Sequence, residues 1–468
     1  SPMAIVYRST RGRAPELGFS DVLVAGLASD GGLYVPAQIP PLDPTISPND
    51  SYADLAVAVM WPYVEGSIEQ SDFAEMVADT YAGFSHSDTA PLVELSPGEW
   101  LCDLSLGPTL AFKDFALQLL GRLLDYELEK RDQRVTVIGA TSGDTGSAAI
   151  HALANRERID VVILHPEGRV SEVQRRQMTT VAAPNVTNLA VQGTFDDCQD
   201  LVKAAFGDPE LRHRARLAAV NSINWARVMA QTAYYVSAAV RVAPGEPISF
   251  SVPTGNFGNI LSAWYAKHMG LPIEQLIVAS NRNDVLTRVM ATGSLSAAEV
   301  VPSLSPSMDI QVSSNFERLL FEASDGDHDG VTRLLTEFRE NGQATVDPRW
   351  MERIRSEFDA GRLDDAGTLA EMRRVFDEHG LLIDPHTAVG LGVGRQLRTQ
   401  RDVPLVVMAT ADAAKFAGAV REATGQEAEL PERVGDLMAL PEHYEVIHND
   451  LDAVRDFLPL QSEAGDND

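Results

Sequence analysis

Cysteine is nearly missing from this chain of 468 residues, which contains only Cys102 and Cys198. Two cysteines cannot build a disulfide framework, and no Cys-x-x-Cys or His/Cys spacing indicates a metal site. We therefore expect no bound metal, and a reducing compartment, the cytoplasm, as the location. Long apolar runs are missing too. No uninterrupted stretch approaches the length that crosses a bilayer, and the start of the chain shows no signal peptide, so we expect no membrane partner.

Positive charge is also scarce. The chain carries 38 lysine and arginine residues against 67 aspartate and glutamate residues, a formal net charge of -29. This balance excludes a nucleic-acid footprint or an anionic membrane surface as partner. It leaves room for a phosphorylated small molecule, because a few local arginines can reverse the potential inside one cleft. A hydrophobic content of 44% and a charged content of 22% are typical of a globular enzyme.

Buried strands alternate with helices through much of the chain. Residues 135–138 and 161–164 are continuous apolar runs on either side of an alanine-rich helix at 147–154, the pattern of a βαβ unit in a parallel sheet. The pattern returns with strands at 248–252, 276–279 and 405–408 and a helix at 260–269. We predict an α/β fold in four parts: an N-terminal α/β domain at 3–95, α/β domains at 96–245 and 246–460, the second with a helical insertion at about 315–380, and a disordered tail at 461–468.

Lysine is the rarest charged residue, and one of the five lysines has an unusual setting. Lys113 lies between Phe112 and Phe115, just after a Gly-Pro turn and at the predicted start of an amphipathic helix. The helix macrodipole and the apolar neighbours disfavour an ammonium there, so we expect an amine that loses its proton readily, as a Schiff base with a carbonyl cofactor requires. Taken alone, a surface lysine at a helix end is the more economical interpretation.

A second stretch, residues 140–147, follows the strand at 135–138 and opens a helix. Ligands of parallel α/β sheets bind at the carboxyl ends of strands, so the hydroxyls and N–H groups of this loop suit a carboxylate or phosphate. The spacing is neither a Walker loop nor a nucleophile elbow. A plain Ser/Thr helix cap is the alternative.

A third stretch, residues 253–259, has the same context after the strand at 248–252. Gly255 and Gly258 permit a concave nest of backbone N–H groups at a helix N-terminus, which binds a phosphate without basic side chains. An ordinary βα loop is the alternative. Together, the three stretches supply an imine-forming lysine, an anion loop and a phosphate nest, which is the inventory for pyridoxal 5′-phosphate. None of the other four lysines has a comparable setting.

The chain resembles the threonine synthase family of fold-type II pyridoxal-phosphate enzymes from about Tyr7 to Phe416. The motifs that carry the resemblance are residues 107–118, 140–147, 221–224, 251–259 and 308–318. Residues 9–12 and 30–36 fit the long bacterial and fungal branch of that family. The resemblance implies a tryptophan synthase β-like fold with two parallel-sheet α/β domains, the active site between them, and an additional N-terminal α/β segment.

The resemblance also implies roles for individual residues. Lys113 is expected to form the internal aldimine and to move protons at Cα and Cβ of the substrate. The residues implied to bind the cofactor are Gly255, Asn256, Phe257 and Gly258 at its phosphate, Asp144 at its phenolic oxygen, Thr410 at its pyridine nitrogen, and Asn259. Those implied to bind the substrate are Thr141, Ser142 and Thr145 at its carboxylate, and Asn221, Ser222 and Arg227 at its phosphate, with Arg169 as a weaker second candidate for the phosphate.

The implied activity is that of a carbon–oxygen lyase in amino-acid biosynthesis. It converts O-phospho-L-homoserine and water to L-threonine and phosphate by γ-elimination and β-addition, in a monomer or homodimer. Two positions depart from the family, since Leu106 and Asp412 replace its usual histidines. Either these changes are neutral, or they mark a paralogue, a phospho-lyase or β/γ-replacement enzyme acting on another phosphorylated amino acid such as O-phosphothreonine. A cofactor-binding scaffold without turnover is a further alternative.

Overall fold

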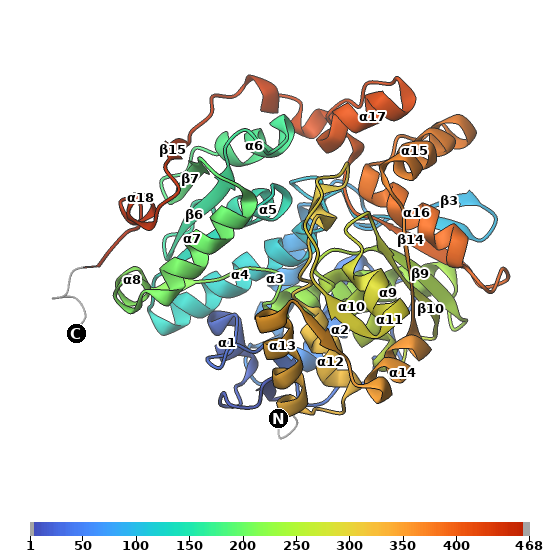
Figure 1. Cartoon of the computed structure of the whole chain (residues 1–468), viewed down its shortest axis with the longest axis horizontal. Helices are drawn as coiled ribbons and strands as arrows, with labels where there is room; N and C mark the ends of the chain where they lie inside the picture. Colours follow the sequence, from blue (N-terminus) through green and yellow to red (C-terminus); the bar gives the residue numbers. More distant parts are fainter. Residues whose placement is uncertain (1–3, 462–468) are drawn as a thin grey trace. The chain divides into compact units, whose positions relative to one another are not determined.

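The computed structural model describes residues 4–461, and these fall into two compact units (Figure 1). The first unit comprises the residues up to Val22, Leu27–Ala116 and Ser222–Glu429, and the second comprises Leu23–Gly26, Leu117–Asn221 and the residues from Leu430 on. The two units have other boundaries than the predicted domains, which divide the chain near residues 95 and 245. The predicted domains stay a prediction. The predicted tail lies outside the described residues from position 462 on.

The first unit is built on a six-stranded sheet. Its order is β13 (Phe358–Arg362), β10 (Ile273–Ser280), β9 (Ile248–Pro253), β14 (Leu405–Ala409), β4 (Glu99–Asp103) and β3 (Leu92–Ser96), with only β3 antiparallel. All six residues of β9 are buried, including Ser249 and Ser251, as expected of a central parallel strand that is covered on both faces. Helix α16 (Pro385–Leu397) packs on β9, β10 and β14. The sheet order brings the loops after β9, β14 and β4 to one edge.

Apart from α16, the first unit contains ten α-helices that lie wholly within it and four short strands among its described residues. They are α2 (Tyr52–Val64), α3 (Gln70–Ala82), α9 (Trp225–Val242), α10 (Gly258–His268), α11 (Val285–Thr292), α12 (Phe316–Ala323), α13 (His328–Asn341), α14 (Pro348–Glu357), α15 (Asp365–His379) and α17 (Ala417–Thr424), with short strands β1 (Tyr7–Ser9), β2 (Tyr34–Pro36), β11 (Ser294–Ser296) and β12 (Gln343–Thr345). Helix α9 packs against both α2 and α10. Two further helices, α1 (Phe19–Ala25) and α4 (Asp114–Arg131), pass from one unit into the other.

The predicted helical insertion contains a strand that the sequence does not reveal. Strand β13 interrupts the helices between α14 and α15 and pairs in parallel with β10. It is an edge strand with exposed polar positions, so it lacks the apolar run that marks a buried parallel strand.

The second unit has a five-stranded parallel sheet. Its order is β15 (Glu445–Ile447), β7 (Val186–Val191), β6 (Ile159–Pro166), β5 (Val135–Ala140) and β8 (Leu217–Ala218). Its helices are α5 (Asp144–Leu153), α6 (Glu172–Thr179), α7 (Phe195–Gly207), α8 (Pro209–Ala215) and α18 (Leu451–Arg455). The predicted βαβ unit is present as β5, α5 and β6, and the predicted α/β class is confirmed.

Two searches of residues 4–461 are negative. No helix there combines the length and the apolar character needed to cross a membrane. The same part of the chain contains no group of three or more His, Cys, Asp and Glu side chains placed to hold a metal ion.

Candidate active site

Lys113 is buried, with 6% of its surface exposed, and it directly precedes α4. Its Nζ lies 5.6 Å from the centroid of the Phe112 ring. The predicted helix start and aromatic neighbour are therefore confirmed, and the surface-lysine alternative is wrong. The backbone around Lys113 is joined to the segment after β14, because Phe112 N donates to Thr410 O (2.8 Å) and Asp412 N donates to Leu110 O (2.9 Å).

The turn that carries Lys113 is held by a carboxylate that the sequence did not single out. Asp114 accepts hydrogen bonds from Thr109 N (2.8 Å) and Thr109 Oγ1 (2.7 Å). A Cβ at Gly107 would lie 2.6 Å from the Asp114 side chain, so only glycine fits there. Lys415, also buried, donates from Nζ to Thr109 O (2.9 Å). The turn is thus held at Thr109 from two sides, by the Asp114 carboxylate and by the Lys415 ammonium.

The loop between β9 and α10 has the geometry of an anion nest. Phe257 is held at φ +73°, in the left-handed region, immediately before α10 begins at Gly258. The carbonyls of Gly255 and Asn256 accept hydrogen bonds from Ser313 Oγ (2.8 Å) and Asn315 N (2.9 Å). A trans peptide points its C=O and N–H in opposite directions, so the amides of Asn256 and Phe257 are directed away from that segment. These two amides suit a phosphate, whereas Gly258 N at the helix start donates to Asn256 Oδ1 (2.9 Å).

Asn259 lies in the first turn of α10 and contacts α9. Its Oδ1 accepts hydrogen bonds from the hydroxyls of Tyr234 (2.5 Å) and Tyr235 (2.6 Å), which fix α10 against α9. Its buried Nδ2 has no hydrogen-bond partner among residues 4–461. An orphaned donor at a helix N-terminus is the kind of group that a bound phosphate oxygen satisfies. Direct contact of Asn259 with a cofactor stays a prediction.

The predicted substrate-phosphate residues divide at the boundary between the units. Asn221 is exposed and is the last residue of the Leu117–Asn221 segment of the second unit, whereas Ser222 and Arg227 belong to the first unit. Arg227 lies in the first turn of α9, and burial lowers the pKa of its guanidinium to about 10, so it stays charged at neutral pH. A buried cation at a helix N-terminus favours an anionic ligand.

In the second unit, the loop between β5 and α5 is tightly organised. Thr141 Oγ1 accepts hydrogen bonds from Gly143 N (2.9 Å) and Gly146 N (2.8 Å), whereas the N-cap of α5 is Gly143, which has no capping side chain. The role of Thr141 at a substrate carboxylate stays a prediction. Ser142 and Thr145 are half-buried. Asp144 is buried and accepts a hydrogen bond from Gln174 Nε2 (3.0 Å), a residue that the sequence did not single out.

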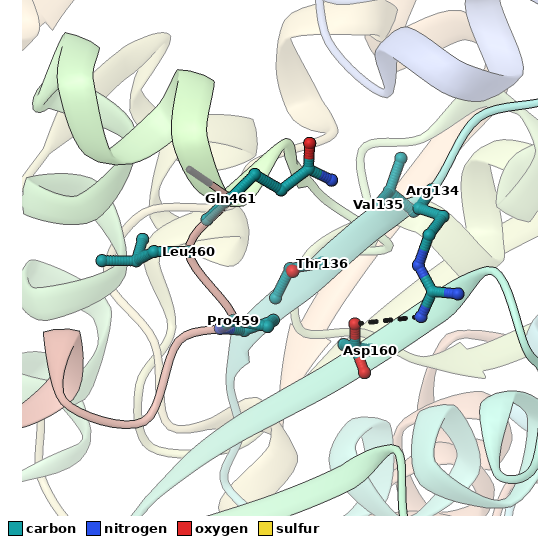
Figure 2. A pocket seen from close by; sticks show the side chains of 8 residues that line it. Arg134, Val135, Thr136, Asp160, Pro459, Leu460 and Gln461 are labelled. Carbon is teal, nitrogen blue, oxygen red and sulfur yellow. Dashed lines mark ion pairs between the residues drawn. The ribbon is translucent and has the colours of Figure 1, made fainter. Parts of the chain in front are cut away.

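Arg169 is exposed in the turn after β6. Its role at a substrate phosphate stays a prediction. Within the second unit, Figure 2 shows a different hollow, lined by Arg134, Val135, Thr136 and Asp160 together with Pro459, Leu460 and Gln461. It lies at the amino ends of β5 and β6, opposite the ends at which parallel sheets bind ligands, so it is not the candidate site.

Asp412 and Leu106, which depart from the family pattern, differ in whether the structure explains them. Asp412 Oδ1 accepts a hydrogen bond from Ala414 N (2.8 Å) and caps the 3-10 helix η2 (Ala413–Phe416), a position that favours aspartate over histidine. Leu106 is half-buried, and nothing in the structure explains its choice. Thr410, buried at the end of β14, lies next to Ala411, which bridges Ala111 in the turn that carries Lys113.

Comparison with known proteins covers nearly the whole chain. Residues 6–81 match the family model described as threonine synthase N terminus, residues 87–339 the one described as pyridoxal-phosphate dependent enzyme, and residues 387–458 the one described as threonine synthase, C-terminal. A threonine synthase of Pseudomonas aeruginosa is 50% identical over 98% of this chain and 99% of its own length.

A solved structure leads to the same family. The crystal structure of a PLP-bound threonine synthase from Brucella melitensis superposes with a TM-score of 0.94 at 48% identity, covering 97% of this chain and 99% of that one. Threonine synthase-like 2 of Xenopus laevis is more distant, at 33% identity over 92% of this chain and 93% of its own length.

Proposed function

This chain belongs to the threonine synthase family of pyridoxal-phosphate-dependent enzymes, and from that premise we propose how its residues convert O-phospho-L-homoserine and water to L-threonine and phosphate. The resemblance in the sequence and the predicted cofactor are confirmed. The observation that supports the proposal is the order of strands in the first unit, because the segments that carry Lys113 and the 253–259 loop both leave the carboxyl ends of nearby parallel strands. They follow β4 and β9, which are separated only by β14.

The cofactor, when bound, supplies an electron sink that acidifies the substrate carbons. Lys113 is the residue that would hold its aldehyde, and the Lys113 amine would remove and return protons at Cα and Cβ of the substrate. Gly255, Asn256, Phe257 and Gly258 hold the cofactor phosphate. The carbonyls of Gly255 and Asn256 keep this loop in place by accepting hydrogen bonds from residues 313–315. Thr410 is the proposed hydroxyl at the pyridine nitrogen, and Asp144 is the proposed group at the phenolic oxygen.

The substrate is proposed to be held at both ends. Thr141, Ser142 and Thr145 receive its carboxylate, with Thr141 donating the proton that its two backbone contacts leave free. Ser222, Asn221 and Arg227 receive its phosphate, with Arg169 as a second candidate. The Arg227 guanidinium neutralises the charge on the phosphate as it leaves Cγ, and water then adds at Cβ.

The test is a phosphate-release screen over phosphorylated amino acids, with products identified by mass. We expect L-threonine from O-phospho-L-homoserine. Release of phosphate with oxobutyrate alone would instead establish a phospho-lyase. A holoenzyme that shows its absorbance band but releases no phosphate from any substrate would establish the cofactor-binding scaffold.

Substitutions of Asp412 test whether this residue serves as a helix cap or alters the reaction. Asp412→Ala is expected to lower the free energy of unfolding by about 1 kcal/mol, whereas Asp412→Asn, an equally good cap, is expected to change it by only a few tenths. Thermal denaturation measures both. Because Asn removes the charge but keeps the cap, an altered product distribution in Asp412→Asn alone would contradict the structural role.

Gly255→Ala tests the nest. A Cβ at this position would lie 2.6 Å from Ser307 O, a backbone atom, so the loop must shift. We expect a loss of about 1–3 kcal/mol in stability and at least about tenfold weaker cofactor binding, measured by titration of the apoenzyme. The matched control is Gly418→Ala in α17, where a Cβ meets nothing within 4 Å. Equal cofactor affinity in the two variants would contradict the nest.

We further propose that the enzyme works in the cytoplasm. Both cysteines are buried free thiols, as expected in a reducing compartment. A monomer or homodimer stays a prediction, which light scattering of the purified protein tests.

A further inference from the structure

Two helices of the first unit begin side by side. Helix α9 begins at Trp225 after its N-cap Asn224, and α10 begins at Gly258 after Phe257. Ser262 Oγ donates to Val228 O (2.8 Å), and each of these residues lies one turn inside its helix. The loops that precede the two helices are therefore neighbours. The proposed function assigns the first loop to the substrate phosphate and the second to the cofactor phosphate.

One short segment, residues 313–315, touches both loops. Towards the cofactor loop, Ser313 Oγ and Asn315 N donate to the carbonyls of Gly255 and Asn256. Towards the substrate loop, Asn315 Nδ2 donates to Ser222 O (2.8 Å), and Ser314 Oγ lies 3.4 Å from Ser222 Oγ. Asn315 itself is fully buried. Its backbone is thus joined to one phosphate loop and its side chain to the other.

Arg318 fixes the orientation of the Asn315 amide. Its Nη1 donates to Asn315 Oδ1 (2.6 Å), so the amide oxygen faces Arg318 and the amide nitrogen must face Ser222 O. Arg318 is fully buried, and its remaining hydrogen bonds reach backbone oxygens: Nη2 donates to Ile223 O (2.7 Å) and Tyr34 O (2.7 Å), and Nε donates to Tyr34 O (3.0 Å). The guanidinium therefore also holds the residue after Ser222, which makes the arrangement rigid.

We propose that Asn315, oriented by Arg318, is a positioning residue that sets the separation between the substrate-phosphate loop at Ser222 and the cofactor-phosphate loop at 255–257. This inference rests on the proposed function, because it gives each loop the ligand assigned above. The phosphate leaves a carbon three atoms from the substrate nitrogen, so the reaction depends on the distance between the two phosphates. A pair of loops held by one side chain keeps that distance constant when either phosphate is absent.

Asn315→Asp is the sharpest test, because it keeps the size of the side chain and its contact with Arg318 but replaces the donor to Ser222 O with an acceptor. With the purified holoenzyme we expect a rise of about tenfold in KM for O-phospho-L-homoserine and a similar weakening of competitive inhibition by inorganic phosphate. We expect the absorbance band of the holoenzyme to persist, because the backbone contact with Asn256 O is retained. If Asn315 serves only to anchor Arg318, KM and phosphate inhibition stay unchanged, because the carboxylate of the variant also accepts the hydrogen bond from Arg318.

The matched control is Asn185→Asp in the second unit. The Asn185 amide donates to the carbonyls of Leu153, Arg156 and Ile159, so the same substitution costs stability there without reaching either phosphate loop. Where Asn315→Asp gives no folded holoenzyme, Asn315→Ser removes both side-chain contacts without adding a charge, and the same results are expected. Wild-type values of KM and of phosphate inhibition in the folded variant overturn the inference. Failure of the wild-type enzyme to release phosphate overturns the proposed function instead.

Discussion

Lys113→Ala is expected to lower the turnover of O-phospho-L-homoserine by at least about 1,000-fold, because one amine both binds the cofactor aldehyde and moves protons at two substrate carbons. The holoenzyme band of wild-type protein should be missing from the variant even at saturating cofactor. A phosphate-release assay measures the loss of turnover, and the absorbance spectrum of the same sample measures the loss of the band. The control is Lys203→Ala, an exposed position on α7.

A second buried lysine sharpens this test. Lys415 is buried, and its Nζ donates to Thr109 O (2.9 Å) in the turn that carries Lys113. We expect Lys415→Ala to keep the band and to lose only part of the activity through a looser turn. A band that survives in Lys113→Ala and disappears in Lys415→Ala would transfer the cofactor bond to Lys415 and contradict the assignment.

Arg227→Ala is expected to raise KM for O-phospho-L-homoserine by about 100-fold, the effect of losing two charge-assisted hydrogen bonds to one phosphate. Arg227→Lys should give an intermediate value, since it keeps the charge but loses the planar fork. Steady-state kinetics with inorganic phosphate as a competitive inhibitor measure both. The cofactor band should be unchanged, because the cofactor phosphate is held by the nest of α10.

Arg241→Ala is the matched control for Arg227. It lies near the other end of α9 and donates only to the carbonyls of Asp88 and Asp50 among the contacts in the described residues. We expect a small loss of stability and a wild-type KM. An unchanged KM in Arg227→Ala, with normal turnover, would show that the substrate phosphate is bound elsewhere, and Arg169 would then be the next candidate.

Much of the site was predictable because its parts are local. Lys113 was recognisable from its turn and its aromatic neighbours, and the 253–259 nest from two glycines between a buried strand and a helix. A strand followed by a helix places the loop between them at the carboxyl edge of a parallel sheet, so a ligand loop is visible without knowledge of the other strands. The same logic located the 140–147 loop.

The residues that the sequence analysis missed act over long separations. Arg318 holds Tyr34 O, and Lys415 holds Thr109 O, contacts between residues 284 and 306 positions apart. Asp114 and Gln174 are ordinary polar residues in the sequence, and only their neighbours reveal their roles. Strand β13 was missed for a related reason, since an edge strand carries no apolar run.

The sequence by itself thus determined the class of fold and the cofactor, and it predicted Lys113 as the amine that binds it, because each depends on a short stretch with a strict local requirement. The tertiary structure alone decided that β14 lies between β4 and β9, that Asp412 serves as a helix cap, and that Asn315 joins the loops before α9 and α10. Hydrophobic periodicity specifies which residues are buried in a strand but not which strand becomes its neighbour. The order of strands follows from the packing of the whole unit, and that order is what assembles the site.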